Sequence, residues 1–263
     1  MKNTILATSI ALACFATVAH ADYPEVIINS DIVLDYDQYI DMTSVVNVPT
    51  SVDLSDTADI SVNQFNHDSP ISATGGVSNN TMPQGTDGIT SIEVNVTAVG
   101  NNAAIEVDSA NPVIGSVQGN QNSTHYATGN ITGNRIDLAQ GEIVQLDVTA
   151  VGNNLSIDAE DSRGGIELGS IQFNYESGST AVGSISGNGF DVNAVGRDPV
   201  LNVTAVGNNL SVIAPTTGSL TQINRGSAVH ALGLISRNTG NVGPVELAVT
   251  AVGNNISIKP VGE

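Results

Sequence analysis

Residues 96–102 read Val-Thr-Ala-Val-Gly-Asn-Asn, and the same seven residues recur unchanged at 148–154, 203–209 and 249–255. Successive copies therefore begin 52, 55 and 46 residues apart. Identical heptapeptides at a spacing of this size are typical of repeat proteins, in which each copy belongs to one structural unit. The spacing of this motif decides the fold, and the rest of the chain is interpreted around it.

A second block recurs between the heptapeptides. Each copy begins with a glutamine and keeps Asn two residues on, Ala nine on, Gly eleven on and Asn sixteen on. The four glutamines are Gln64, Gln118, Gln172 and Gln222. Residues 64–263 therefore read as four tandem two-block units, at about 64–105, 118–158, 172–212 and 222–258.

The alternation of side chains within each block predicts strands. Residues 93–98, Glu-Val-Asn-Val-Thr-Ala, alternate polar and apolar side chains with the period of a strand that buries one face. Gly-Asn-Asn favours a turn, and the alternation resumes after it, as in residues 155–157. Each block is therefore predicted to be strand–turn–strand. No segment after residue 21 has a helical period, so we expect an all-β chain.

Two architectures would explain why identical residues recur. A β-solenoid stacks its rungs about 4.8 Å apart, which lets Asn and Gln side chains at equal positions form hydrogen-bonded ladders. Eight rungs, one for each block, would span about 38 Å at that spacing. The alternative is a row of tandem small β-sandwich units of about 50 residues, short for independent domains without disulfides. The short, aliphatic blocks favour the solenoid.

The ladder and turn positions follow from the repeat. They are Asn101, Asn102, Asn153, Asn154, Asn208, Asn209, Asn254, Asn255, Gln64, Gln118, Gln172, Gln222, Gly100, Gly152, Gly207 and Gly253.

The N-terminus reads as an export signal. Lys2 precedes an apolar stretch over 5–18, and Ala19-His20-Ala21 is a small-residue cleavage site, so residues 1–21 are predicted to be a signal peptide. The alternative is a lipoprotein in which Cys14 is acylated. Cys14 is the only cysteine, so cleavage after Ala21 removes disulfide and thiol chemistry. No later apolar run approaches the roughly 20 residues of a membrane helix. We expect a secreted protein, outside or on the surface of a bacterium.

The charge distribution argues against a nucleic-acid partner and distinguishes an acidic N-terminal segment. The net charge is -19 and only 13% of residues are charged, which argues against nucleic-acid binding because that requires clustered Lys and Arg. The segment 22–63 is acidic, and no Lys or Arg occurs between Lys2 and Arg135. This segment is expected to be a cap, a secretion-targeting segment or a flexible arm, or simply a solvated acidic face.

Catalytic and metal sites find little support. The repeat-invariant positions contain no acid or base, so we expect no enzyme and no cofactor. Asp35 and Asp37 are the closest candidate calcium ligands, but no recognised calcium-binding loop is present. His67, His125 and His230 are scattered without a thiolate, which argues against zinc, and His67 and His125 read as exposed single residues. A row formed by Thr97, Thr149, Thr204 and Thr250 could make an ice-binding face, although Asn95 and Asp147 beside it make the face irregular.

The repeats resemble the curlin-type repeats of bacterial functional amyloids. The similarity lies in residues 148–157, VTAVGNNLSI, and in residues 222–228, QINRGSA, and it extends over about 195 residues. The chain departs from that pattern because Ala98, Ala150, Ala205 and Ala251 stand where curlin repeats have Gln, the second Gln of a rung is missing, and two kinds of block alternate. The resemblance implies secretion as an unfolded chain, help from outer-membrane secretion and nucleation factors, and polymerisation with itself or a related subunit.

These observations lead to a functional hypothesis. The protein is expected to be a secreted structural subunit of an extracellular fibre or biofilm matrix, self-assembling through stacked rungs. The alternative is a monomeric β-solenoid adhesin that binds a surface or glycan through the loops between blocks. The last heptapeptide block ends close to Glu263 with no distinct cap after it, which favours end-to-end stacking because an open strand edge recruits another chain.

Overall fold

The computed structural model describes residues 25–30, 39–46, 49–54, 59–79, 81–82, 91–107, 112–138, 144–160, 165–192, 199–240 and 246–259. Every regular element in these ranges is a β-strand, and the described part of the chain contains no helix. The all-β prediction is confirmed. The predicted signal peptide, with Cys14, and the acidic pair Asp35 and Asp37 lie outside the described residues.

The strands form four complete coils and one partial coil. The first complete coil holds β4(Asp59–His67), β5(Ile71–Ser78), β6(Thr81–Met82) and β7(Ser91–Val107), and the second holds β8(Val113–Gln121), β9(Thr124–Thr132), β10(Arg135–Leu138) and β11(Val144–Asp158). The third holds β12(Ile166–Tyr175), β13(Gly178–Ser186), β14(Gly189–Val192) and β15(Val200–Ile213), and the fourth holds β16(Thr216–Arg225), β17(Ala228–Ser236), β18(Thr239–Gly240) and β19(Glu246–Lys259). The partial coil at the N-terminal end holds β1(Glu25–Ser30), β2(Tyr39–Val46) and β3(Pro49–Leu54).

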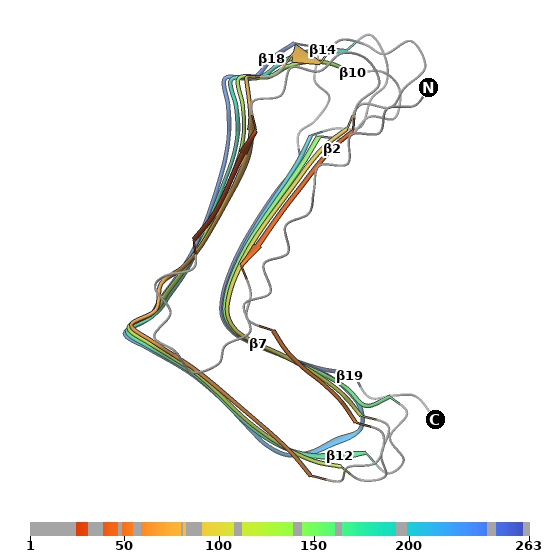
Figure 1. The fold of residues 1–263 in the computed structure, drawn as a ribbon, viewed down its shortest axis with the longest axis vertical. Helices are drawn as coiled ribbons and strands as arrows, with labels where there is room; N and C mark the ends of the chain where they lie inside the picture. Colours follow the sequence, from red (N-terminus) through yellow and green to blue (C-terminus); the bar gives the residue numbers. More distant parts are fainter. Residues whose placement is uncertain are drawn as a thin grey trace.

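Equivalent strands of successive coils pair in parallel and make four sheets. The sheets run β4-β8-β12-β16, β1-β5-β9-β13-β17, β6-β10-β14-β18 and β7-β11-β15-β19, and β2 and β3 both pair with β7. Viewed along the stack, the strands of one sheet lie almost on top of one another (Figure 1). Equal repeat positions are in register, for example Gln118 with both Gln64 and Gln172. The chain is a β-solenoid, and the tandem-sandwich alternative is wrong.

One rung contains both sequence blocks, not one. The Gln-anchored block of each unit supplies the first two strands of a coil, and the heptapeptide block supplies the last strand. Within the four complete coils, each block pairs only with the same block of the neighbouring coils, because ladders of identical residues require identical partners. The expected eight rungs are therefore four complete coils and a partial one, which stack to about 24 Å at the ordinary strand spacing.

The Gly-Asn-Asn of each heptapeptide bends a strand instead of ending it. Strands β7, β11, β15 and β19 each continue through the motif without interruption, and Figure 1 shows the bend that they share. None of the four glycines has a positive φ. Close packing explains them: a Cβ on Gly152 would lie 2.5 Å from the Gly207 carbonyl oxygen. The predicted turn is therefore wrong at this position.

The real corners follow the Gln-anchored strands. Asp68, Asn122, Glu176 and Gly226, with φ of 51°, 53°, 50° and 63°, occupy the first corner of successive coils. Asn79, Gly133, Gly187 and Arg237, with φ of 58°, 69°, 68° and 56°, occupy the second. Asn and Gly tolerate this left-handed conformation best, which explains why they are frequent at these corners.

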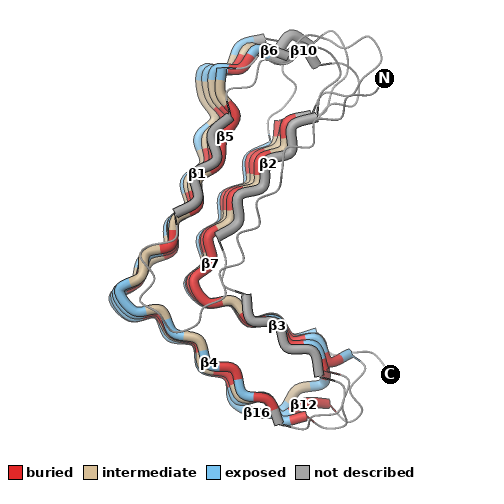
Figure 2. Tube along the Cα trace, viewed as in Figure 1, coloured by how far each residue is buried: buried red, intermediate tan, exposed pale blue. Residues whose placement is uncertain are grey.

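The bend gives the coil an L-shaped cross-section with a separate apolar core in each arm (Figure 2). In one arm, β5, β9 and β13 pack on the first halves of the long strands, through residues such as Ala127, Val148 and Leu201. In the other arm, β4, β8 and β12 pack on the second halves, through residues such as Ile114, Leu155 and Leu168. Each core is two side chains thick, so small and aliphatic residues fill it.

Part of the acidic segment 22–63 lies on the first complete coil. Strand β1 pairs with β5, and β2 and β3 pair with β7. The described part of this segment therefore adds a partial coil to the N-terminal end of the stack.

Among the described residues, nothing has the length and apolarity of a membrane-crossing helix.

Candidate functional site: the amide ladders and the C-terminal coil

The bend brings Asn side chains from two sheets together at the elbow between the two apolar cores. The first Asn of each Gly-Asn-Asn points inward, as does the Asn two residues after each repeat glutamine. We call this set the Asn zipper: Asn66, Asn101, Asn120, Asn153, Asn174, Asn208, Asn224 and Asn254. Its central members are fully buried, with Asn153, Asn208 and Asn120 at 0% exposure. Buried amides of this kind must be satisfied by hydrogen bonds.

The zipper satisfies them along the solenoid axis and across the elbow. Along the axis, Asn101 Nδ2 donates to Asn153 Oδ1 at 2.7 Å and Asn153 Nδ2 donates to Asn208 Oδ1 at 2.7 Å. Across the elbow, Asn120 Nδ2 donates to Asn153 Oδ1 at 2.9 Å and Asn174 Nδ2 to Asn208 Oδ1 at 3.0 Å. The same amide groups also donate to backbone carbonyls, such as that of Phe173. One connected network therefore joins all four complete coils.

The glutamines form a second ladder beside the zipper. Gln118 Nε2 donates to Gln64 Oε1 at 2.8 Å, Gln172 Nε2 to Gln118 Oε1 at 2.8 Å, and Gln222 Nε2 to Gln172 Oε1 at 2.7 Å. Each Nε2 also donates to the carbonyl of the second Asn in its own coil, as from Gln118 to Asn154 at 2.8 Å. The glutamines thereby tie the two blocks of one coil together as well as neighbouring coils.

The second Asn of each motif forms a third ladder, which we call the outer Asn ladder. Asn154 Nδ2 donates to Asn102 Oδ1 at 2.6 Å, Asn209 Nδ2 to Asn154 Oδ1 at 2.7 Å, and Asn255 Nδ2 to Asn209 Oδ1 at 2.7 Å. On the N-terminal side, the register partner of Asn102 is Pro49. Proline has no side-chain amide, so this ladder ends at Asn102.

Two further ladders lie at the corners, and sequence reasoning did not assign them. Asn134 Nδ2 donates to Asn188 Oδ1 at 3.0 Å, and Asn188 Nδ2 to Asn238 Oδ1 at 3.1 Å. At the other corner, the backbone N–H of Ser123 donates to Ser177 Oγ at 3.1 Å. Serine stands five residues after every repeat glutamine, at Ser69, Ser123, Ser177 and Ser227. That invariance was a usable signal for the serine ladder.

The His125 side chain is buried beside the elbow, so the expectation that it is exposed is wrong. Its position in β9 is in register with Ile71 and Ser179, both inward-facing, and its ring fills space that Gly100 leaves by lacking a Cβ. Burial lowers the pKa of His125 to about 4, partly opposed by a backbone hydrogen bond with Gly178. His67, by contrast, is exposed beside Asp68, 2.8 Å from its carboxylate.

The Thr row is in register over all four coils, but the adjacent column runs Asn95, Asp147, Asn202 and Ala248, which is irregular. Within the described ranges, no three His, Cys, Asp or Glu side chains come together as metal ligands.

The C-terminal coil, β16–β19, leaves core positions open. Leu247, Val249, Ile256 and Ile258 are 46%, 45%, 45% and 44% exposed, whereas their register partners in β15 are at most 1% exposed. Gln222 Oε1 is buried without a hydrogen-bond partner in the described part of the chain. In the coils before it, the equivalent atom accepts from the next glutamine. The coil therefore presents the apolar rows and the amide acceptor that another coil would cover.

Comparison with known proteins gives one match. Residues 138–261 match the family described as HfaD: Holdfast attachment protein D. The matched stretch runs from the end of β10 to just beyond β19. No curated protein and no solved structure matches the chain.

Proposed function

We propose that the protein is a secreted, non-catalytic structural subunit of an extracellular attachment structure, and that it self-assembles by stacking coil on coil. Two observations support this. Residues 138–261 are similar to a family whose name describes attachment of a holdfast, and the C-terminal coil leaves a set of core positions uncovered. The open coil is the observation that carries the self-assembly part of the proposal.

The apolar rows supply the driving force. Full burial of a Val, Leu or Ile side chain stabilises by about 1.5–3 kcal/mol. Leu247, Val249, Ile256 and Ile258 are each a little under half exposed, so covering all four contributes roughly 4 kcal/mol. Backbone N–H and C=O groups of β17 and β19, which end two of the sheets, add parallel strand pairing. A coil of similar shape would satisfy both at once.

The resemblance to curlin-type repeats supports the same proposal, although each rung here contains two different sequence blocks. The partner is a second copy or a related subunit. Delivery through the outer membrane and nucleation at the cell surface belong to the proposal. The predicted N-terminal signal peptide leads to a separate expectation, that the exported protein begins at Asp22. N-terminal sequencing of protein recovered from the medium or the cell surface would show this.

The test is direct. Residues 22–263 are purified in denaturant, diluted into buffer, and observed by negative-stain electron microscopy and fibre diffraction. Fibres with a meridional reflection near 4.7–4.8 Å are expected, because strands would run across the fibre axis. Discrete soluble particles with strong β circular dichroism would contradict self-assembly and favour a monomeric adhesin that binds through its inter-block loops.

A matched variant probes the outer Asn ladder. Replacing Asn102, Asn154, Asn209 and Asn255 together by Asp puts like charges on consecutive rungs and removes every amide donor of the ladder. We expect no fibres from this variant. Unchanged fibre formation would contradict a role for the ladder in building a stackable coil.

A further inference from the structure

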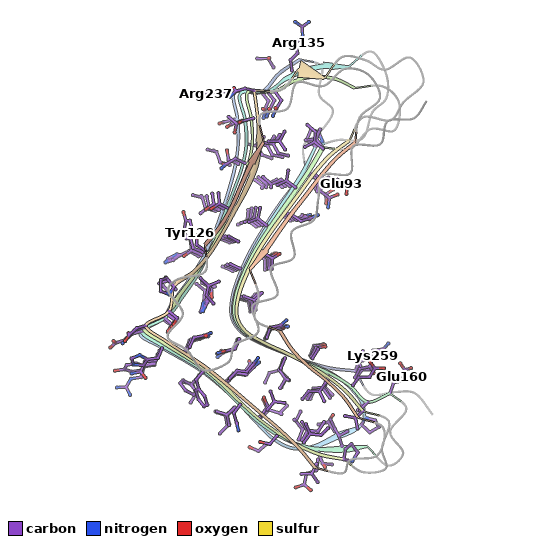
Figure 3. All side chains as sticks on the ribbon, viewed as in Figure 1. Glu93, Tyr126, Arg135, Glu160, Arg237 and Lys259 are labelled. Carbon is purple, nitrogen blue, oxygen red and sulfur yellow. The ribbon has the colours of Figure 1, made fainter. Side chains whose placement is uncertain are left out.

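The two ends of the solenoid differ in charge. Residues 216–259, the C-terminal coil, contain Arg225, Arg237 and Lys259 and a single acid, Glu246. The segment 22–63 contains no Lys or Arg, and its acids are Asp22, Glu25, Asp31, Asp35, Asp37, Asp41, Asp53, Asp56 and Asp59. Arg237 and Lys259 lie near the ends of the two arms of the L, so the positive charge is spread over the whole coil (Figure 3). The acidic end and the basic end are electrostatically complementary.

The C-terminal coil also differs from the others on its outer face. Leu232 and Leu234 in β17 are 60% and 51% exposed. Their register partners in β13 are Val182 and Ser184, and the partners one coil further back are Thr128 and Asn130. Leucines at these outward positions occur only in this coil. Other coils also expose apolar side chains, such as Phe65 and Ile171, but these two leucines lie on the coil that ends the stack.

We propose that the C-terminal coil binds the N-terminal coil, β1–β3, of a second copy, so that the subunits stack head to tail. The proposal rests on self-assembly and adds its polarity, its partner surface and its register. In each sheet the strand order already provides the match: β17 and β1 are opposite ends of one sheet, and β19 and the β2–β3 pair are opposite ends of another. Continuing both sheets from one copy to the next places β17 beside β1 of the second copy, and β19 beside its β2 and β3.

The register of the sheets identifies the residues that meet. One column runs through Asp53, Glu106, Asp158, Ile213 and Lys259. Continued by one coil, this column puts Lys259 in register with Asp53 of the second copy. In-register residues on neighbouring parallel strands have Cα atoms about 4.8 Å apart, so these two residues attract. A second column runs through Asp41, Glu93, Gln145, Val200 and Glu246, and it puts Glu246 in register with Asp41 of the second copy, where the charges repel.

The two columns give a pair of variants with opposite effects. Asp41→Asn and Asp53→Asn make the same chemical change on the same coil. In the proposed register, Asp53→Asn removes the partner of Lys259 and slows assembly, whereas Asp41→Asn removes a repulsion and speeds it. We expect the two assembly rates to differ by about tenfold at low salt, within the range of electrostatic steering, and to converge at high salt as screening shortens the Debye length. Equal rates for the two variants would overturn the register.

Disulfide trapping tests the contact itself. The chain from residue 22 onward contains no cysteine, and the spacing of 4.8 Å lies within the Cα separation that a disulfide spans. Lys259→Cys and Asp53→Cys are introduced into one chain, which is assembled under a mild oxidant and run on a denaturing gel without reductant. A ladder of multimers is expected. The control combines Lys259→Cys with Asp41→Cys, which lies in the other column, and should give no ladder.

The single-cysteine variants distinguish the alternatives. Lys259→Cys alone should stay monomeric on the gel, and a dimer would overturn the proposal in favour of two C-terminal coils meeting. Wild-type protein that assembles while the Lys259→Cys/Asp53→Cys chain gives no ladder would also overturn the head-to-tail contact, and would leave self-assembly standing. Wild-type protein that does not assemble at all would contradict the proposed function. Circular dichroism of each variant before assembly shows that it is folded.

Discussion

Asn153 and Asn154 are neighbours with the same side chain, and replacing each by aspartate separates the contribution of the buried zipper from that of the outer ladder. Asn153 Nδ2 donates to Asn208 Oδ1, Asn174 Oδ1 and the Phe173 carbonyl, at 2.7, 3.2 and 3.0 Å. In Asn153→Asp, an oxygen replaces this donor and faces three acceptors at a site with 0% exposure. An ionised carboxylate cannot persist there, so the aspartate must stay protonated in the folded protein.

The loss of folding stability in Asn153→Asp follows from that protonation. An unfolded aspartate has a pKa of about 3.9, so holding it protonated at pH 7 costs about 4 kcal/mol at 1.36 kcal/mol per pH unit. The pKa of this aspartate is raised on folding, so the penalty is present above pH 4 and disappears as the pH falls to the unfolded value. Asn154→Asp loses one donated bond, to Asn102 Oδ1, at a half-buried site and still accepts from Asn209. Its cost is about 1 kcal/mol.

The assay is denaturant unfolding followed by circular dichroism, at protein concentrations too low for assembly and at pH 7 and pH 4. We expect Asn153→Asp to lower the unfolding free energy by about 3 kcal/mol more than Asn154→Asp at pH 7. Most of this difference should vanish at pH 4. Two variants with equal stability at pH 7, or a difference that does not respond to pH, would refute the argument that the zipper is a buried, fully satisfied network.

Three other outcomes follow from the same contacts. Burial lowers the pKa of His125 to about 4, so the unfolded chain takes up a proton before the folded protein does as the pH falls. The free energy of unfolding should therefore decrease by about 3 kcal/mol between pH 6.5 and pH 4. The variant His125→Ser, which copies Ser179 of the next coil, should remove most of this pH dependence in unfolding curves recorded over the same range. Gly152→Ala should cost more than 2 kcal/mol because its Cβ would lie 2.5 Å from the Gly207 carbonyl oxygen, whereas in Gly253→Ala the nearest atom is Asn224 Nδ2 at 3.4 Å and thermal unfolding should change little. Asn188→Ala should cost about 2 kcal/mol in the same assay, because it leaves the buried Ile131 carbonyl without its 2.9 Å side-chain hydrogen bond.

Much of the fold follows from repeat spacing and alternation. Equal positions in consecutive units are in register, so the spacing of Gln64, Gln118, Gln172 and Gln222 already defined a column of one sheet. The alternation of polar and apolar residues correctly predicted which side chains lie on the buried face of a strand, since Val96 and Ala98 are buried and Thr97 between them is turned outward. These features are predictable because a parallel ladder repeats the same local requirement at every rung.

The errors came from local preferences that neighbouring coils override. Gly-Asn-Asn has the composition of a turn, but Gly100, Gly152 and Gly207 are needed for space against the next coil, and the first Asn is needed as a zipper member. The bend, which brings Asn101 within reach of Asn120, depends on how two sheets pack and has no local signature. His125 was misplaced for the same reason, since its burial depends on a cavity that a glycine of another strand provides. The number of rungs could have been predicted from the sequence. Two blocks with different residues cannot form ladders with each other, so both blocks must lie in the same rung.

The position of Pro49 separates the stability of the coil from the choice of partner. Were the outer Asn ladder to continue between subunits, Asn255 would require an amide in register on the next copy. The N-terminal coil instead presents Pro49 in that column, and proline at a sheet edge is a common protection against indiscriminate pairing. The ladders therefore hold coils together within one chain, where every complete coil has its amide. Between chains, the contact depends on apolar rows that any coil could cover and on charges that only an acidic end complements. A subunit built in this way keeps its register rigidly and still selects which end of another molecule it accepts.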